Sequence, residues 1–91
     1  MLARRYFISG DVQGVGFRYF VIREVQRIGP IKGFVRNLRD GRVEVYAEAS
    51  EDLITQLEKS LHKGPGMSEV TNVRIDEEVP ENKYPDFRIT F

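Results

Sequence analysis

The sequence predicts an α+β domain in which two helices pack on one face of an antiparallel sheet. Apolar residues recur at helical spacing in two segments, one after Gly16 and one after Ser50. Four other segments have the short apolar patterns of strands, at residues 3–9, 31–38, 42–49 and 70–79. An Asp-Gly pair at 40–41, between the second and third of these segments, indicates a hairpin.

Each predicted helix has its own boundary signals. The first ends at Gly29-Pro30, because proline cannot continue a helix and glycine commonly follows its last turn. In the second, Ser50 is expected to cap the N-terminus, and Glu51 and Asp52 suit the positive end of the helix dipole. The buried stripe of this helix is predicted to consist of Leu53, Ile54, Leu57 and Leu61.

The βαββαβ order of these segments indicates a ferredoxin-like sandwich, with a short additional strand formed by Phe87, Ile89 and Phe91. In this arrangement the third strand lies between the first two, so the C-terminal ends of strands one and two share one edge of the sheet. The loop that leaves the first strand would then lie beside the end of the second strand, where Asn37 stands.

The composition argues against several classes of partner and of chemical site. Fourteen basic residues balance fourteen acidic ones, so no net charge draws the chain to nucleic acid or to a membrane surface. The chain has no cysteine, which excludes disulfides, thiolate metal sites and cysteine nucleophiles, and suits a reducing compartment. No apolar run has the length of a signal or a membrane span. We expect a cytoplasmic monomer with one domain, residues 1–91, and neither a nucleic-acid nor a membrane partner.

The stretch GDVQGVGFR, residues 10–18, joins the first strand to the first helix and contains three glycines. Backbone amides of such a loop can point inward together, and a helix N-terminus adds unpaired N–H groups and partial positive charge. Both features favour a phosphate-sized anion. The stretch has neither the Lys-Ser/Thr of a Walker A loop nor the spacing of a dinucleotide motif. Taken alone, its glycines favour a merely tight turn.

Arg18 shifts the balance toward an anion site. A cation in the first turn of a helix opposes the helix dipole by about 0.3–1 kcal/mol when exposed. No acidic residue between Phe17 and Arg23 compensates it. An anion held between the loop amides and Arg18 would remove this conflict; a carboxylate elsewhere in the fold is the alternative partner.

Other polar residues have simpler interpretations when they are considered alone. Asn37 is typical of an ordinary strand end near a turn. The only histidine, His62, falls in the last turn of the second helix, where it suits the helix dipole better than a role as ligand or base. The carboxylates are scattered, and no spacing among them indicates a metal site.

Two motifs resemble those of the acylphosphatase family. One is the V-Q-G-V-x-F-R pattern, complete from Val12 to Arg18, and the other is Gly-aromatic-x-x-Asn, from Gly33 to Asn37, followed by Asp-Gly. The similarity extends over nearly the whole chain, through KGPG to the terminal FRITF. It implies hydrolysis of the carboxyl–phosphate bond of a small-molecule acyl phosphate to carboxylate and inorganic phosphate, without metal or cofactor. Inorganic phosphate would then be both product and competitive inhibitor.

By the same resemblance, Arg18 would hold the phosphoryl group and Asn37 would orient the attacking water. The backbone amides of the loop would bind the phosphate, at Asp11, Val12, Gln13, Gly14, Val15, Gly16 and Phe17. The chemistry agrees, since acyl phosphates have a good leaving group and phosphoryl transfer demands chiefly positioning and neutralisation of charge.

Three departures from the family pattern are visible. Three residues, rather than the usual two, separate Gly29 from Gly33, so the end of the helix and the start of the next strand are expected to differ. Asp11 stands where the family more often has a basic or neutral residue, and its carboxylate would weaken dianion binding if it pointed inward. Ala49-Ser50 replaces a more usual Glu-Gly, which the capping role of Ser50 explains locally.

Two other classes of function stay open at this point. Ferredoxin-like sheets also build RNA-recognition domains, and Lys32–Val35 resembles part of their stacking motif, although zero net charge and the missing aromatic positions argue against this class. A non-catalytic anion-sensing module would have the same fold and loop. Turnover of an acyl phosphate separates an enzyme from such a sensor, and salt-dependent binding of single-stranded RNA would indicate the RNA-binding class.

Overall fold

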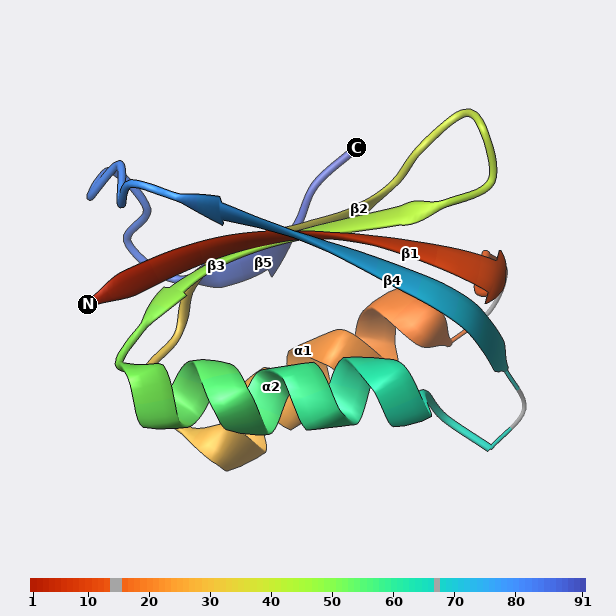
Figure 1. Ribbon diagram of the computed structural model, residues 1–91, viewed down its shortest axis with the longest axis horizontal. Helices are drawn as coiled ribbons and strands as arrows, with labels where there is room; N and C mark the ends of the chain where they lie inside the picture. Colours follow the sequence, from red (N-terminus) through yellow and green to blue (C-terminus); the bar gives the residue numbers. More distant parts are fainter. Residues whose placement is uncertain (14–15, 67) are drawn as a thin grey trace.

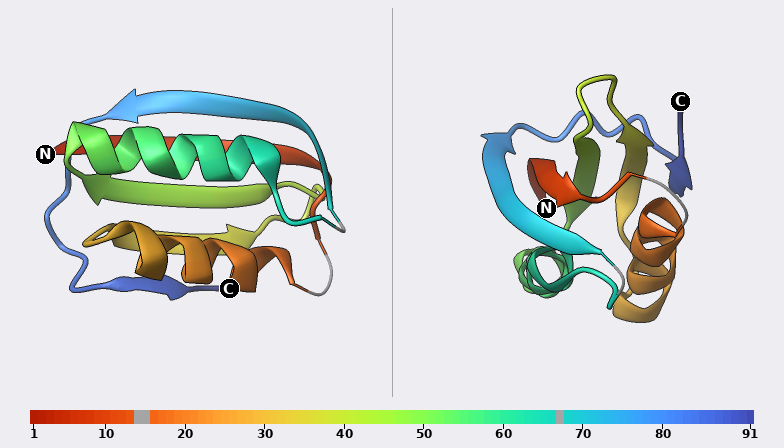
Figure 2. Two further views of the ribbon diagram at one scale, coloured as in Figure 1. Left: turned by 90° about the horizontal axis from the view of Figure 1, so that it is seen from below. Right: turned by 90° about the vertical axis from the view of Figure 1, so that its right-hand side faces the viewer.

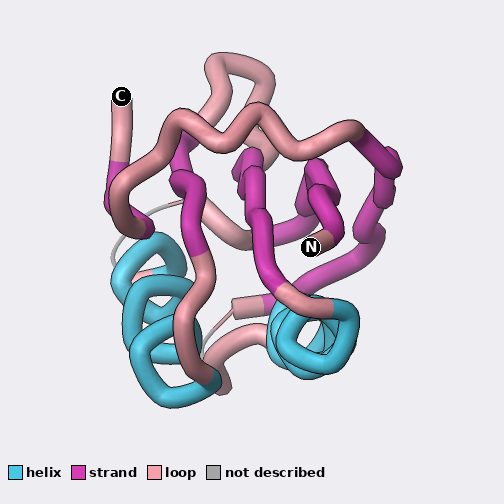
Figure 3. The backbone as a smooth tube through the Cα atoms, turned by 90° about the vertical axis from the view of Figure 1, so that its left-hand side faces the viewer, coloured by secondary structure: helices cyan, strands magenta, loops and turns pink. Residues whose placement is uncertain are grey.

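A five-stranded sheet lies on two helices in the computed structural model, which describes residues 1–13, 16–66 and 68–91 (Figure 1). The same two layers are seen end-on in Figure 3. This confirms the predicted α+β sandwich. In chain order the elements are β1 (Leu2–Asp11), α1 (Phe17–Ile28), β2 (Lys32–Asn37), β3 (Val43–Ala49), α2 (Glu51–Lys63), β4 (Glu69–Glu78) and β5 (Phe87–Ile89).

The strands are arranged in the order β4-β1-β3-β2-β5 (Figure 2). As predicted, β3 lies between β1 and β2 and is antiparallel to both. The terminal strand β5 runs parallel to β2, from Gly33↔Phe87 to Val35↔Ile89, so the sheet is mixed. The reason is that the connection 79–86 starts and ends at the same end of the sheet, which reverses the chain between β4 and β5 (Figure 1).

Strand β1 lies between β4 and β3 in the sheet. It pairs with β3 from Leu2↔Ala49 to Ile8↔Val43. On its other side it pairs with β4 from Ala3↔Glu78 to Asp11↔Glu69, with an irregularity between Ser9 and Gly10. Its two neighbours therefore come from the middle and from the last third of the sequence.

The core lies between the sheet and the helices. The alternation of β1 places Tyr6 and Ile8 on the helix side, where both are fully buried, and Phe7 on the other. In Figure 2, α2 lies over β1 and β3, and α1 lies over β2 and β5. Burying such side chains contributes about 1.5–3 kcal/mol each. The helix residues in this core are Phe17, Val21, Val25, Ile54, Leu57 and Leu61, with Leu53 only partly buried.

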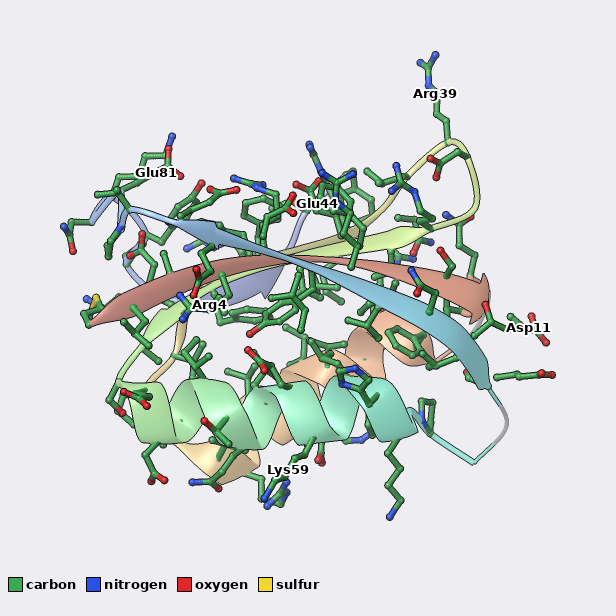
Figure 4. All side chains as sticks on the ribbon, in the orientation of Figure 1. Arg4, Asp11, Arg39, Glu44, Lys59 and Glu81 are labelled. Carbon is green, nitrogen blue, oxygen red and sulfur yellow. The ribbon has the colours of Figure 1, made fainter. Side chains whose placement is uncertain are left out.

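The central strand β3 is buried on both faces, which its alternating sequence does not reveal. On the face opposite the helices, Glu44 is 3% exposed and forms ion pairs with Arg5 and Arg36. Figure 4 shows Glu44 on this side of the sheet. The buried charge of Glu44 is thus compensated by two arginines, as buried charges in proteins usually are.

The second buried carboxylate of β3 anchors the connection 79–86. Glu48 Oε2 accepts hydrogen bonds from the Tyr46 hydroxyl (2.6 Å), the Glu81 amide (2.6 Å) and the Asn82 amide (3.2 Å). Burial acts to raise the pKa of the Glu48 carboxyl, but these hydrogen bonds outweigh it, so the pKa lies below its ordinary value. The connection is therefore held to the sheet by an ionised side chain.

The element boundaries agree closely with the sequence signals. Helix α1 ends at Ile28, where the Gly29 amide donates to the Val25 carbonyl (3.2 Å), and the additional residue of this region lies in the connection before β2. Ser50 occupies the N-cap position of α2, although its side chain makes no capping hydrogen bond. Within the described residues, no helix has the length and apolar character needed to cross a membrane.

Candidate functional site

Gly10, near the end of β1, and Gly16, directly before α1, serve different purposes. A Cβ on Gly10 would lie 2.0 Å from the Glu69 carbonyl oxygen, so the close pairing of β1 with β4 requires this glycine. A Cβ on Gly16 would meet nothing within 4 Å, but its φ of 110° is one that other residues rarely adopt. Gly16 therefore provides the turn into α1 and leaves the space in front of the helix open. Gly14 and Val15, two of the predicted phosphate contacts, lie outside the described residues.

The N-terminus of α1 has backbone donors that the helix does not use. The first helical hydrogen bond runs from the Phe20 amide to the Gly16 carbonyl (2.8 Å), so the amides of Phe17, Arg18 and Tyr19 precede it. The N-cap residue is Gly16, which has no side chain to cap them, and the first turn contains no acidic residue. Such a helix end favours an anion.

Arg18 is half-buried in this first turn. Its guanidinium carbon lies 5.5 Å from the centroid of the Phe91 ring, within the range of a cation–π contact. None of the ion pairs found among the described residues includes Arg18, so the alternative of a carboxylate partner elsewhere in the fold has no support there. Sequence reasoning missed Phe91, because a contact between the second residue of a helix and the last residue of the chain leaves no spacing pattern.

Asn37 is the last residue of β2 and carries an unpaired acceptor. Its Cα pairs with that of Val43, which in turn pairs with Ile8, so the three residues form one row across the sheet. The carboxamide oxygen Oδ1 is buried and accepts no hydrogen bond from any described residue. Leaving a buried acceptor unpaired costs about 1–3 kcal/mol. This cost favours a bound water or ligand at Asn37.

Four contacts bring the loop, α1 and the end of β2 to the same end of the sheet. The Gln13 side chain donates to the Leu38 carbonyl (2.5 Å) and to the Arg42 carbonyl (2.9 Å), on either side of the hairpin that follows Asn37. The Thr90 amide donates to the Val35 carbonyl (2.9 Å), which holds the chain end beside β2. The cation–π contact with Phe91 then places Arg18 next to this chain end.

The hairpin next to Asn37 is closed by its own charged residues. The Leu38 amide donates to the Arg42 carbonyl (2.8 Å), and Asp40 accepts from the Arg42 amide (3.0 Å) and from Arg42 Nε (2.9 Å). The bond from the backbone amide of Arg42, together with its guanidinium, lowers the pKa of Asp40. These interactions therefore favour the ionised form of Asp40 in the closed hairpin.

The other predicted loop contacts are in different environments. Val12 is 1% exposed and packs in the core, whereas Asp11 is exposed. Figure 4 shows the Asp11 side chain directed away from the body of the protein, and Arg39 pointing outward from the hairpin. The inward orientation of Asp11 that would weaken anion binding is therefore not the one observed.

The remaining candidates have structural partners. His62 is exposed on α2, with Nδ1 2.9 Å from the Glu58 carbonyl oxygen one turn earlier. Phe34, in the segment that resembles an RNA-stacking motif, packs against the rings of Tyr46 (5.9 Å) and Tyr84 (5.8 Å). In the part of the chain that the structure covers, no group of three or more His, Asp or Glu side chains could hold a metal ion.

Comparison with known proteins agrees with this geometry. The family model Acylphosphatase matches residues 4–89. An acylphosphatase from Koribacter versatilis is 45% identical over 86 residues, covering 94% of this chain and 77% of the relative. One from Thermotoga maritima is 42% identical over 91 residues, with 100% and 99% covered. The crystal structure of an acylphosphatase from Bacillus subtilis matches 100% of both chains with a TM-score of 0.93 at 36% identity.

Proposed function

This chain belongs to the acylphosphatase family, and we propose that it hydrolyses acyl phosphates at the end of the sheet where the loop, Arg18 and Asn37 meet. The observation that carries the assignment of this site is the buried Oδ1 of Asn37, which has no hydrogen-bond partner among the described residues, at the same end as the uncapped, cationic first turn of α1. The Asn37 oxygen requires a hydrogen-bond donor such as water, and the first turn of α1 favours an anion. A phosphoryl group attacked by water would supply the anion and the donor together.

Binding of the phosphoryl group is the task of α1 and its loop. The Arg18 guanidinium can contact two equatorial oxygens at once, which a single point charge cannot do. The amides of the first turn, with those of the loop from Asp11 to Phe17, neutralise the remaining charge. Because the first-turn amides belong to a helix that is formed before substrate arrives, they need little reorganisation as charge shifts in the transition state.

Attack is the task of water held by Asn37. The carboxamide oxygen accepts a hydrogen bond from the water, whose oxygen then bonds to phosphorus as the bond between phosphorus and the acyl oxygen breaks. The carboxylate leaves with the electron pair of that bond, and the proton of the water passes to a phosphate oxygen. A carboxylate is a good leaving group, so we expect no metal or cofactor to be required.

The sequence does not specify the acyl group of the substrate. Competitive inhibition by phosphate follows from the binding site, since the product keeps the oxygens that Arg18 and the amides contact. A cytoplasmic monomer acting without nucleic acid remains the predicted setting.

Two measurements test the function. The first is release of phosphate from acetyl or benzoyl phosphate, with and without EDTA; we expect equal rates and competitive inhibition by inorganic phosphate. Activity that disappears with EDTA and returns with Mg²⁺ would contradict the metal-free mechanism. No turnover by folded protein on several acyl phosphates would instead favour the anion-sensing module.

The second measurement separates the role of Asn37 from that of Arg18. Asn37→Ala should lose about a hundredfold in kcat, because positioning of this kind is worth a few kcal/mol. It should still bind phosphate within severalfold of wild type, as measured by calorimetry. Near-normal kcat would leave Asn37 an ordinary strand-end residue, and a loss of phosphate binding equal to that of Arg18→Gln would make it a binding group.

A further inference from the structure

The side chain of Gln13 is engaged with protein rather than free for substrate. Its Nε2 atom donates one proton to the Leu38 carbonyl oxygen at 2.5 Å and the other to the Arg42 carbonyl oxygen at 2.9 Å. A carboxamide nitrogen has two protons, so its donor capacity is fully used. The family resemblance assigns Gln13 only a backbone amide in the loop and gives this side chain no role.

The two acceptors lie on opposite sides of the hairpin that follows Asn37. Leu38 is the residue after Asn37, and Arg42 precedes Val43, the pairing partner of Asn37 in β3. The Leu38 amide also donates to the Arg42 carbonyl (2.8 Å), which closes the hairpin at this point. Gln13 is therefore attached to both strands of the hairpin, one residue beyond the row that contains Asn37.

On the loop side, Gln13 directly follows the buried residue Val12. Val12 is 1% exposed and packs in the core, so the backbone before Gln13 is held by burial. The side chain of Gln13 then attaches residue 13 itself to the hairpin. The start of the loop thus has two anchors, one apolar and one polar, and only the polar one connects it to the strand end that carries Asn37.

We propose that Gln13 is a positioning residue whose side-chain amide sets the distance between the phosphate-binding loop and Asn37. The proposal rests on the function given above, in which the loop holds the phosphoryl group and Asn37 holds the attacking water. In-line attack requires these two groups to be aligned, and a misplacement of about 1 Å can cost on the order of a hundredfold in rate. The side chain of Gln13 acts on the reaction through this alignment and contacts neither water nor phosphate.

The first test is Gln13→Ala, which removes both hydrogen bonds from an exposed residue without adding charge. We expect kcat to fall by about ten- to a hundredfold, while the Kd for inorganic phosphate stays within severalfold of wild type. The matched control is Gln56→Ala, because Gln56 is an exposed glutamine on α2 whose Nε2 donates only to Asp52 (3.3 Å). Normal kcat in Gln13→Ala, or an equal loss in the control, would overturn the proposal.

A double-mutant cycle with Asn37→Ala distinguishes positioning from a general loss of order. If Gln13 acts through Asn37, Gln13→Ala should cause little further loss of kcat once Asn37 has been removed. Losses that multiply fully in the double variant would overturn the proposal, because Gln13 would then act independently of Asn37. Thermal unfolding of all four proteins checks that each kcat refers to folded enzyme.

The same cycle separates failure of this proposal from failure of the proposed function. If Asn37→Ala loses kcat and Gln13→Ala does not, the positioning role of Gln13 is contradicted but the proposed function is not. Near-normal Asn37→Ala contradicts the water-orienting role on which both depend.

Discussion

The two helices begin at opposite ends of the molecule, and their N-termini are built in opposite ways (Figure 1). The first turn of α2 contains Glu51 and Asp52, whose charges suit the positive end of the helix. The first turn of α1 contains no acidic residue and has Arg18 instead. Two helices of almost equal length thus differ in whether the chain itself supplies the anion.

The difference lies in which charges the described residues compensate. At the α2 end, Glu51 and Asp52 suit the helix dipole, and Glu48 Oε2 accepts hydrogen bonds from two amides and a hydroxyl, although Glu48 Oε1 is buried without a partner among the described residues. At the α1 end, the first-turn amides, Arg18 and Asn37 lie at the same end of the sheet, and no ion pair among the described residues includes Arg18. We therefore expect a bound anion to stabilise the α1 end.

Substitution of Arg18 should have the largest effect on activity and phosphate binding at the α1 end. Arg18→Gln removes the bidentate cation, and Arg18→Lys replaces it with a point charge, so both should lose about a hundredfold or more in kcat/KM. In wild type, phosphate at ten times its Kd should stabilise the fold by about 1.4 kcal/mol, and this protection should nearly vanish in Arg18→Gln. Steady-state kinetics and thermal unfolding with and without phosphate give both values.

The matched control is Arg74→Gln, which makes the same change at an exposed position of β4 paired only with Asp76. It should keep normal turnover and normal phosphate protection. Near-normal activity of Arg18→Gln would mean that another residue holds the phosphoryl group.

Acid should destabilise the α2 end through Glu48. Because the folded-state pKa of Glu48 lies below its ordinary value of 4.5, ionised Glu48 contributes stability above that pH, and the contribution is lost as pH falls through the folded-state pKa. Glu48→Gln should lower the unfolding free energy at pH 7 by about 1–2 kcal/mol, since hydrogen bonds to a charged acceptor are the stronger ones. Its stability should also vary less with pH below 4.5.

Denaturant unfolding at several pH values measures this effect. Glu77→Gln is the control, because Glu77 pairs with Arg4 while its side chain is 79% exposed, and such a pair is worth little. A pH dependence equal to wild type in Glu48→Gln would show that Glu48 contributes nothing through ionisation.

Removing the acidic residues of α2 should have a smaller effect, confined to stability. Glu51→Gln and Asp52→Asn should each cost about 0.3–1 kcal/mol at low salt, and less at high salt, because these exposed charges interact with the helix dipole. Neither should change kcat/KM. Urea unfolding at two salt concentrations, together with the phosphate-release assay, checks both statements, and a loss of activity would contradict the assignment of function to the α1 end alone.

Neutralising Asp11 should give the smallest effect, and in the favourable direction. Asp11 is exposed and directed away from the body of the protein, so it repels a bound dianion only through solvent (Figure 4). Two unit charges about 8 Å apart in water interact by on the order of 0.5 kcal/mol, and a unit charge with a dianion by about twice that before screening. Asp11→Asn should therefore improve phosphate affinity by at most about fivefold at low salt. A tenfold gain measured by calorimetry would mean that the carboxylate turns inward when ligand binds.

The sequence predicts most of the fold because its signals are local. The alternation of Tyr6, Phe7 and Ile8, the Gly29-Pro30 stop and the Asp40-Gly41 turn each depend on a few neighbouring residues, and the structure confirms them. The parallel pairing of β5 and the burial of β3 on both faces could not be predicted in this way. They depend on where the connection 79–86 crosses the sheet.

In the candidate site, too, the sequence predicts residues with local signals but not the contacts between distant segments. Arg18 and Asn37 are found from motifs and from the order of strands, since both lie within predicted elements. The side-chain bonds of Gln13 and the ring of Phe91 beside Arg18 join parts of the chain that are distant in sequence. No spacing rule connects such pairs, so only three-dimensional coordinates reveal them.

The pairing of β1 with β4 also has a consequence for how the chain folds. The first strand to be synthesised must wait for its partner, because Ala3 pairs with Glu78 and Asp11 with Glu69. Contacts between distant parts of the sequence require large loops to close before they give any stabilisation, and they slow folding relative to a helical bundle of the same length. Until β4 has been made, one side of β1 has unpaired backbone groups, and during this interval a nascent chain is most exposed to pairing with another copy.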